Sequence, residues 1–290
     1  IGVDPSDVAY KASKENGFYL YNYFLTSEVA KDIVSKYGKA KLIIANNMFA
    51  HLNNFSPIME AIDILLEKDG IFSLEVHYQR DLIEQRQFDT IYHEHTCYHN
   101  LKTLSKINSY YNLYPFDCYR ISSHSGSIHV NFSREGEYHQ TESLKKILEE
   151  EKKLNYNSSE VFKIFNKAIE DIRNKFYLLK DKGNSICAYG ASGRGAMLLN
   201  ICGLDNNDII FATDLSPLRI NHYIPGTKIP ILNRDELKKN KCDIYFVLAW
   251  NYINQIVSDE REFLSKGGEI LTPLPYPKLI TKSNAKEFFI

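Results

Sequence analysis

The chain has 290 residues, enough for two domains of ordinary size. Hydrophobic residues make up 44% of it and charged residues 24%, a balance that argues against a disordered chain. The formal net charge is −1 without a basic stripe, and no apolar run approaches the roughly 20 residues that span a bilayer, so we expect neither a nucleic-acid nor a membrane partner.

The first half of the sequence alternates apolar runs with helical stretches. Helices are predicted at about residues 6–16, 27–37, 54–67 and 101–113, and strands at 1–4, 19–25, 40–49, 70–77, 114–121 and 126–133. Apolar strands separated by helices predict a parallel sheet that is covered on both faces. The opening "IGVDPS" has the character of the end of a strand, so we expect that an N-terminal segment precedes it.

Helical periodicity replaces this pattern between residues 140 and 182. Apolar residues recur at helical spacing from Val161 to Leu179, which predicts a long amphipathic helix with a shorter charged helix before it. A second α/β pattern begins at Ser185 with a strand, a glycine turn and a helix, and further strands are predicted within 208–214, 242–252 and 267–275. The predicted fold class is therefore α/β, with a helical connector between two α/β units.

The five cysteines are widely spaced and form no CxxC pair, so a structural zinc site within this chain is not expected. Cys187 and Cys242 lie in apolar runs, which is typical of buried free thiols. Without a signal-peptide pattern at its start, the chain is predicted to be cytoplasmic.

Polar residues follow two of the predicted strands. Asp4 could accept hydrogen bonds from the hydroxyls of a bound ribose, or it could belong to the N-terminal cap of the following helix. Asn46, Asn47 and His51 follow the strand "AKLIIA" at the edge where ligands bind in open α/β sheets. Ordinary turn and capping chemistry explains the two asparagines equally simply.

The glycine turn "YGASGRG" lies between a strand and a helix. Such glycines let backbone N–H groups approach a phosphate or carboxylate, and Asp214 ends the next strand as a ribose-binding acid would. The spacing GxxGxG only approximates the dinucleotide signature, so a tight turn without a ligand is the alternative.

The stretch "FDTIYHEHTCYH" holds three of the nine histidines, His93, His95 and His99. The spacing lacks the helical HExxH pattern, which argues against a metal site. A histidine flanked by Glu94 and Tyr92 suits acid–base chemistry, because imidazole titrates near neutrality. Composition alone leaves acid–base chemistry and a plain loop as alternatives.

Several stretches together resemble one family. "AKLIIANNMFAHL", "FDTIYHEHTCYHNLKTL", "SGSIHV" and "YGASGRGAMLLNICGL", followed by "TDLSPLRINHYIPGTKIPI", are similar to bacterial S-adenosylmethionine-dependent C-methyltransferases that act on nucleotide-linked keto sugars. The blocks occur in the family's order along nearly the whole chain, and the best-known members methylate C3 of a TDP-4-keto-deoxysugar.

The resemblance implies three parts: an N-terminal zinc-binding domain, a class I (Rossmann-like) methyltransferase domain and a C-terminal Rossmann-like domain. On this chain it implies an N-terminally incomplete methyltransferase domain at 1–139, a helical connector at 140–183 and a substrate-binding domain at 184–290. The zinc domain and the first glycine-rich cofactor motif have no counterpart in the sequence, so zinc is expected only in a preceding domain.

The same resemblance implies residue roles. It assigns the general base to His95, assisted by Tyr92 and Glu94, and it places His51 at the same site. Contacts to S-adenosylmethionine are expected from Asp4, Asn46 and Asn47.

Contacts to the nucleotide-linked keto sugar are expected from Ser127, Tyr189 and Arg194. The sequence departs from the family at two places on this side. The usual Gly-Gly-Ser with Arg two residues later appears as Ser125-Gly126-Ser127 with His129, and the usual Lys of the glycine turn is Arg194. The sugar or its nucleotide could therefore differ from those of the best-known members.

Two other functions fit parts of the sequence. The unit with the glycine turn and Asp214 could belong to an NAD-dependent nucleotide-sugar oxidoreductase. A non-catalytic binding protein would result if the cofactor motif were lost. The sequence does not indicate an oligomeric state.

Overall fold

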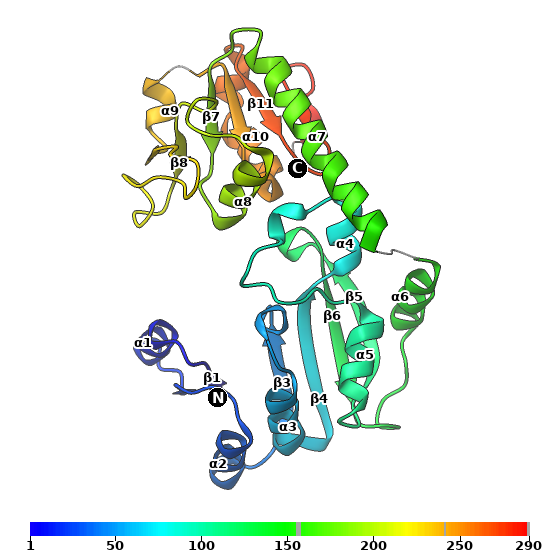
Figure 1. Ribbon diagram of the computed structural model, residues 1–290. Helices are drawn as coiled ribbons and strands as arrows, with labels where there is room; N and C mark the ends of the chain where they lie inside the picture. Colours follow the sequence, from blue (N-terminus) through cyan, green and yellow to red (C-terminus); the bar gives the residue numbers. More distant parts are fainter. Residues whose placement is uncertain (155–157, 241, 289–290) are drawn as a thin grey trace. The chain divides into compact units, whose positions relative to one another are not determined.

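The structure is a computed structural model that describes residues 1–154, 158–240 and 242–288, and it contains two compact units. The first unit comprises Ile1–Gln79 and Glu94–Asn155, and the second comprises Arg80–His93 and Tyr156–Ile290. Figure 1 shows the ribbon coloured along the chain. The chain thus leaves the first unit, contributes fourteen residues to the second, and returns.

The first unit contains a two-stranded sheet and a four-stranded sheet, and helices connect most of the strands. Its strands are β1 (Gly2–Val3), β2 (Leu20–Tyr21), β3 (Ala40–Asn46), β4 (Leu66–His77), β5 (Tyr114–Ile121) and β6 (Ser127–Ser133). Its helices are α1 (Asp7–Glu15), α2 (Ser27–Tyr37), α3 (Ser56–Leu65), α5 (Leu101–Ser109) and α6 (Glu142–Lys153), with short 3-10 turns η1 (Phe49–His51) and η3 (Ser123–Ser125).

The larger sheet of this unit has the strand order β3-β4-β6-β5. β3 and β4 are parallel, as predicted for strands separated by helices, whereas β4, β6 and β5 pair antiparallel, so the sheet is mixed. The reason is the short connection through η3, since a tight turn can join only antiparallel neighbours.

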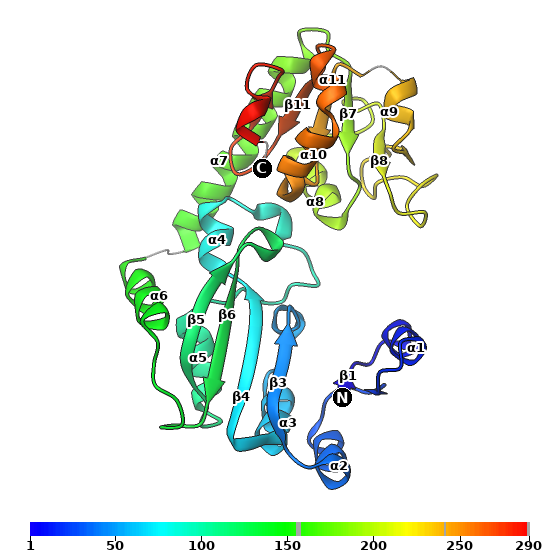
Figure 2. The same ribbon diagram turned by 180° about the vertical axis from the view of Figure 1, so that it is seen from behind.

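The two faces of this sheet differ. Alternate residues of β4 and β6, such as Phe72, Leu74 and Val130, are fully buried against α3, α5 and α6. Figures 1 and 2, seen from opposite sides, show α3 and α5 on this one face. The opposite face carries hydrogen-bonded polar residues at its centre, while Leu42 and Ile44 at its β3 edge are 53% and 61% exposed. The expected cover on both faces is therefore wrong at this edge.

The second unit has the strands β7 (Ile186–Tyr189), β8 (Ala212–Asp214), β9 (Ile231–Asn233), β10 (Ile244–Val247), β11 (Glu269–Thr272) and β12 (Lys278–Ile280). Its helices are α4 (Gln79–Glu84, shared with the end of the first unit), α7 (Ser158–Lys180), α8 (Gly193–Cys202), α9 (Glu236–Lys239), α10 (Ile253–Asp259) and α11 (Arg261–Ser265). Short 3-10 turns are η2 (Phe88–Thr90), η4 (Trp250–Tyr252) and η5 (Ala285–Phe288).

The sheet of the second unit has the order β12-β11-β10-β7-β8-β9, parallel except for β12. This order is that of a Rossmann-like sheet, with the direction of winding reversed between β7 and β10. α7 and α8 cover one face and α10 and α11 the other, as the two views show. The predicted α/β class is confirmed, and the carboxyl ends of β7 and β10 form the edge where such folds place a ligand.

Helix α7 is the long amphipathic helix that the sequence predicts. Its residues Ala168, Ile172 and Phe176 are fully buried, and the Phe176 ring packs on Phe246 of β10 with 5.4 Å between centroids. None of the helices in the described residues combines the length and the apolar character needed to cross a membrane.

The unit boundaries divide the chain differently from the expected spans 1–139, 140–183 and 184–290. α6 belongs to the first unit and α7 to the second, so the two helices of the expected connector are separated. Compact units and family domains are different divisions of a chain, and the expected spans stay a prediction.

A disulfide joins Cys187 to Cys242, with 6.1 Å between their Cα atoms. The prediction of free thiols at these two positions is therefore wrong. The pairing of β7 with β10 brings the two cysteines together, although 55 residues separate them in sequence.

Candidate functional site

The turn η1 follows the carboxyl end of β3 and carries His51 at its end. The segment from Glu94 to Tyr98 lies against this turn because Thr96 binds it twice. The Thr96 amide donates to the Ala50 carbonyl at 2.8 Å, and the Thr96 hydroxyl donates to the Leu52 carbonyl at 2.8 Å. Two stretches more than 40 residues apart in sequence therefore meet at one strand end.

Two histidine rings face each other there. The centroids of His51 and His95 are 5.0 Å apart, and their planes are inclined by 56°. His51 Nδ1 lies 2.9 Å from the carbonyl oxygen of Glu94. Because a carbonyl can only accept, this contact requires a proton on Nδ1 and leaves the lone pair of the neutral ring on Nε2. The pair thus offers an imidazole that can accept a proton.

The predicted assistants of His95 lie on either side of the unit boundary. The Glu94 side chain is exposed, and its backbone carbonyl is the group that orients His51. Tyr92 is partly buried and belongs, with His93, to the second unit. The structure brings His51, Glu94 and His95 together, and the role of Tyr92 stays a prediction.

Cys97 and His99 form a separate, more buried contact. His99 is 2% exposed, and its Nε2 lies 3.3 Å from Cys97 Sγ. Burial lowers the pKa of His99 and raises the pKa of the Cys97 thiol, so both groups favour their neutral forms. No cluster of three metal-binding side chains occurs in residues 1–154, 158–240 and 242–288.

The expected cofactor residues lie at strand ends, and they differ in exposure and in their hydrogen-bond partners. Asp4 follows β1, and its Oδ1 accepts from the Ser6 amide at 2.8 Å, while Ser6 itself caps α1. The side chain of Asn46 is exposed at the end of β3.

Asn47 has a structural partner in the neighbouring strand. It has a left-handed backbone (φ 54°), and both its amide and its Nδ2 donate to Glu75, at 2.8 and 3.1 Å. Turn chemistry thus accounts for Asn47, and Asp4 and Asn46 retain more polar surface for a ligand.

The expected substrate residue Ser127 begins β6 and is fully buried. Its hydroxyl donates to the Ser123 carbonyl at 3.1 Å, which closes the η3 turn. His129, which replaces the family's Arg, stacks on Tyr119 with 4.9 Å between centroids and contacts Ser73 Oγ at 3.2 Å. These two residues are therefore integrated into the polar face of the sheet.

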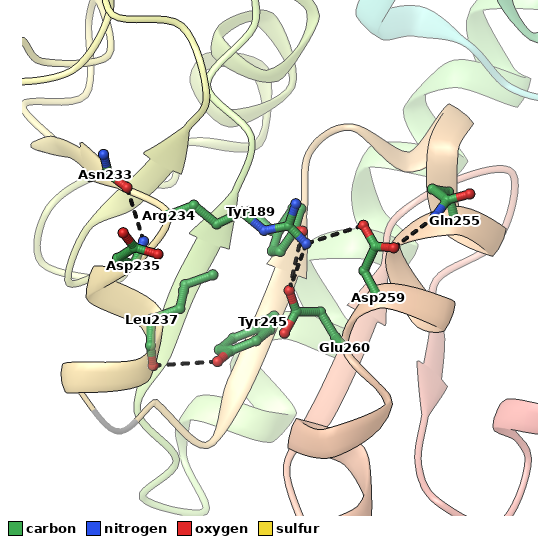
Figure 3. Close-up of polar contacts among 9 residues, drawn as sticks. All are labelled: Tyr189, Asn233, Arg234, Asp235, Leu237, Tyr245, Gln255, Asp259 and Glu260. Atoms are coloured by element: carbon green, nitrogen blue, oxygen red, sulfur yellow. Dashed lines mark hydrogen bonds and ion pairs between the residues drawn. The ribbon is translucent and has the colours of Figure 1, made fainter.

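Tyr189 ends β7 within the polar group of Figure 3. Its hydroxyl donates to Glu260 at 3.2 Å, and the Arg234 guanidinium lies 5.0 Å from the ring centre. Arg234 also donates to both Glu260 and Asp259, at 2.9 and 3.2 Å. Burial and then the Glu260 charge raise the pKa of Tyr189, so its hydroxyl stays protonated and is a donor.

Arg194 lies in the first turn of α8 and pairs with Asp89, a residue that we did not single out from the sequence. Its Nε and Nη2 donate to the two carboxylate oxygens of Asp89 at 3.0 and 3.1 Å. Trp250 Nε1 donates to the same carboxylate at 2.8 Å, and the Arg194 guanidinium lies 4.9 Å from the Trp250 ring centre. The only hint in the sequence was that Asp89 belongs to the histidine-rich stretch and Trp250 is the sole tryptophan.

The glycine turn itself is explained by packing and by Asp214. A Cβ on Gly190 would lie 3.1 Å from Ala249 Cβ, and one on Gly195 would lie 3.0 Å from Leu248. Asp214 accepts from the amides of Ala191 and Ser216. Burial would raise the pKa of Asp214, but these amides and Arg219 outweigh it and hold the pKa below its usual value.

Three comparisons with known proteins found similarities. The model of the C-methyltransferase C-terminal domain matches residues 122–275. C-methyltransferase NovU of Streptomyces niveus is 30% identical over 286 residues, which are 97% of this chain and 68% of that protein. A solved structure of Haemonchus contortus phospholethanolamine N-methyltransferase 2, with phosphomonomethylethanolamine and S-adenosylhomocysteine, has 12% identity and a TM-score of 0.26, covering 93% of this chain and 69% of its own.

The fold is α/β, and it brings the rings of His51 and His95 together at the carboxyl end of β3. The two sequence matches go further, because one covers more than half of the chain and the other nearly all of it. The chain belongs to the C-methyltransferase family. The family expected from the sequence motifs is confirmed, and with it the class of S-adenosylmethionine-dependent C-methyltransferases.

Proposed function

We propose that this protein transfers a methyl group from S-adenosylmethionine to the carbon next to the ketone of a nucleotide-linked 4-keto sugar. The observation that supports the proposal most directly is the facing pair His51 and His95 at the carboxyl end of β3. Carbon is a poor nucleophile until a proton is removed from it, so a C-methyltransferase needs a base at its site.

The proton next to a ketone is acidic enough for an imidazole when the enolate oxygen is stabilised. In the proposed reaction His95 takes this proton, and the electron pair left on carbon forms the new bond to the methyl group. His51 lies beside His95 and is held by the Glu94 carbonyl, so we assign it to support the base or to stabilise the enolate. Glu94 and Tyr92 are proposed to assist from the same stretch.

The cofactor residues fit in part. Asp4 presents a carboxylate at the end of β1, the group that commonly accepts hydrogen bonds from ribose hydroxyls, and Asn46 presents an exposed amide at the end of β3. Asn47 would contribute mainly by shaping this strand end, because Glu75 engages its side chain. When bound, S-adenosylmethionine supplies an electrophilic methyl group on a sulfonium.

Ser127, Tyr189 and Arg194 stay proposed contacts of the nucleotide-linked sugar. Each has an internal partner, which limits the donors that remain. The pair with Asp89 uses the Nε–H and one N–H of Nη2 of Arg194, so a substrate phosphate would have the second N–H of Nη2 and the two of Nη1.

The test is hydrogen–deuterium exchange at the carbon next to the ketone, measured with a TDP-linked 4-keto-6-deoxysugar and the full-length protein. His95→Asn should slow this exchange by about 10²–10⁴-fold, because an amide cannot accept the proton. The exposed His139→Asn in the same unit is the matched control and should leave the rate unchanged. Undiminished exchange in His95→Asn would rule out His95 as the base.

A further inference from the structure

The segment Arg80–His93 is held in the second unit by two buried side chains. Arg86 is 4% exposed and donates to Asp171 Oδ2 at 2.6 Å and to the Pro275 carbonyl at 3.2 Å. Its guanidinium also lies 4.6 Å from the Tyr276 ring centre. Asp89, three residues further on, is fully buried and holds the segment a second time.

The partners of Asp89 come from both sides of the point where the sheet reverses its winding. Arg194 follows β7 in the first turn of α8, and Trp250 follows β10 in η4. In Rossmann-like folds an anionic ligand binds at this place, next to the N-terminus of the helix after the first strand. Here the carboxylate that receives these donors is part of the chain.

We infer that Asp89 is a built-in anion beside Arg194 and Trp250 in the second unit, and that it positions the chain that leads into the proposed acid–base residues. The inference rests on the proposed function for its last part. Asp89 is thus a positioning residue, and the contact of Arg194 with it has an architectural purpose.

The energetics favour a fixed position for this carboxylate. A buried charge is costly unless it is paired and hydrogen-bonded, and Asp89 receives three N–H donors, two of them from a cation in a fork geometry. Removing its partners would leave an uncompensated buried charge. The segment therefore has one strongly preferred location.

This anchor is close in sequence to the proposed site. Tyr92 follows Asp89 by three residues, a stretch that spans at most about 10 Å. The amides of Thr90, Ile91 and Tyr92 also bond back to carbonyls of the same segment. A loosened anchor would therefore shift the start of the acid–base stretch, and a shift of about 1 Å can lower a rate roughly 10²-fold.

The test compares Asp89→Asn with Asp208→Asn in the full-length protein. Asp208 forms an ion pair with Lys180 in the same unit without touching the segment, so it controls for general loss of stability. Amide hydrogen exchange at Thr90, Ile91 and Tyr92 should quicken at least tenfold in Asp89→Asn and stay unchanged in Asp208→Asn. The kcat for methyl transfer should fall about 10–100-fold in Asp89→Asn alone, with KM for the methyl donor little changed.

Trp250→Phe is the milder second variant, since it removes one donor and keeps an aromatic ring beside Arg194. If Asp89→Asn does not fold, Trp250→Phe tests the anchoring instead. It should show faster amide exchange at Thr90, Ile91 and Tyr92 and a lower kcat, both to a smaller extent than expected for Asp89→Asn. Unchanged amide exchange in the variant that folds would overturn the inference. If the wild type neither exchanges nor methylates the TDP-linked sugar, the proposed function fails, while the amide exchange still decides the anchoring.

Discussion

At the scale of single residues, one backbone carbonyl determines which nitrogen of a ring can act. The Glu94 carbonyl accepts from His51 Nδ1, so the neutral ring keeps its lone pair on Nε2. The carboxylate of Glu94, which the sequence suggested as the important group, is exposed. Its backbone contributes the orientation, and a substitution of its side chain would leave that contact in place.

This arrangement predicts the tautomer of His51. Nitrogen NMR of the full-length protein above pH 8 should show His51 protonated at Nδ1, because the carbonyl contact stabilises that form. The exposed His139 provides the reference and should show the mixture of tautomers of a free imidazole. A His51 protonated at Nε2 would mean that the hydrogen bond to Glu94 does not form.

At the scale of elements, the turn between β7 and α8 is shaped by its contact with the strand end of β10. Gly190 has φ +93° and approaches Ala249 closely, which explains the glycine without a ligand. The same turn in a dinucleotide-binding protein needs glycines for contact with a phosphate. The sequence pattern is similar in both cases because close packing and ligand contact both exclude a side chain.

Gly190 and Gly267 both have positive φ, but only Gly190 has a close neighbour, so alanine substitutions at the two positions distinguish backbone strain from steric clash. Gly190→Ala should destabilise the second unit by about 2–3 kcal/mol, through strain at positive φ and a clash with Ala249. Gly267→Ala should cost about 1 kcal/mol, since Gly267 has φ +96° but no atom within 4 Å of an added Cβ. Urea unfolding followed by Trp250 fluorescence measures both, and equal costs would contradict the close packing at Gly190.

At the scale of the whole molecule, stability should depend on pH through His99. Burial lowers the pKa of His99 in the folded protein, whereas the unfolded chain has the ordinary value of about 6.5. The unfolded state then binds the proton more readily as the pH falls, so the free energy of unfolding decreases below about pH 6.5. The decrease ends once the pH is below the folded-state pKa.

Between pH 7.5 and 5.5, the free energy of unfolding should therefore decrease by roughly 1 kcal/mol less in His99→Gln than in the wild type. Amide hydrogen exchange in β4 and β6 is the suitable measurement, because the sole tryptophan lies in the second unit and does not report on the first. The exposed His139→Gln should keep the wild-type dependence. A parallel pH profile in His99→Gln would show that His99 is not the source.

Much of this architecture could be predicted from periodicity. The predicted helix at 27–37 coincides with α2, and the strand at 114–121 with β5. β9 and β12, with three residues each, lie outside the predicted strands. The sequence carried no prediction for the direction of β6, because that direction depends on the turn before the strand.

The site was predictable where function follows from local sequence and less so where it follows from tertiary contacts. His51 and His95 were expected together, and their rings do meet. Asp89 carried no local signal, because its role comes from Arg194 and Trp250, which lie 105 and 161 residues away. The predicted substrate contact of Arg194 took no account of this partner.

The excursion of Arg80–His93 into the second unit limits how this protein can be divided. A contiguous piece beginning after residue 155 contains Arg194, Trp250 and Asp171 but neither Asp89 nor Arg86. In such a piece, Asp171 would lack its partner Arg86, and Arg194 and Trp250 would lack the Asp89 carboxylate to which they donate. A synthetic peptide with the sequence of residues 80–93 should supply Arg86 and Asp89 to this piece in trans, so a chimaera of this protein has to carry both segments of the second unit.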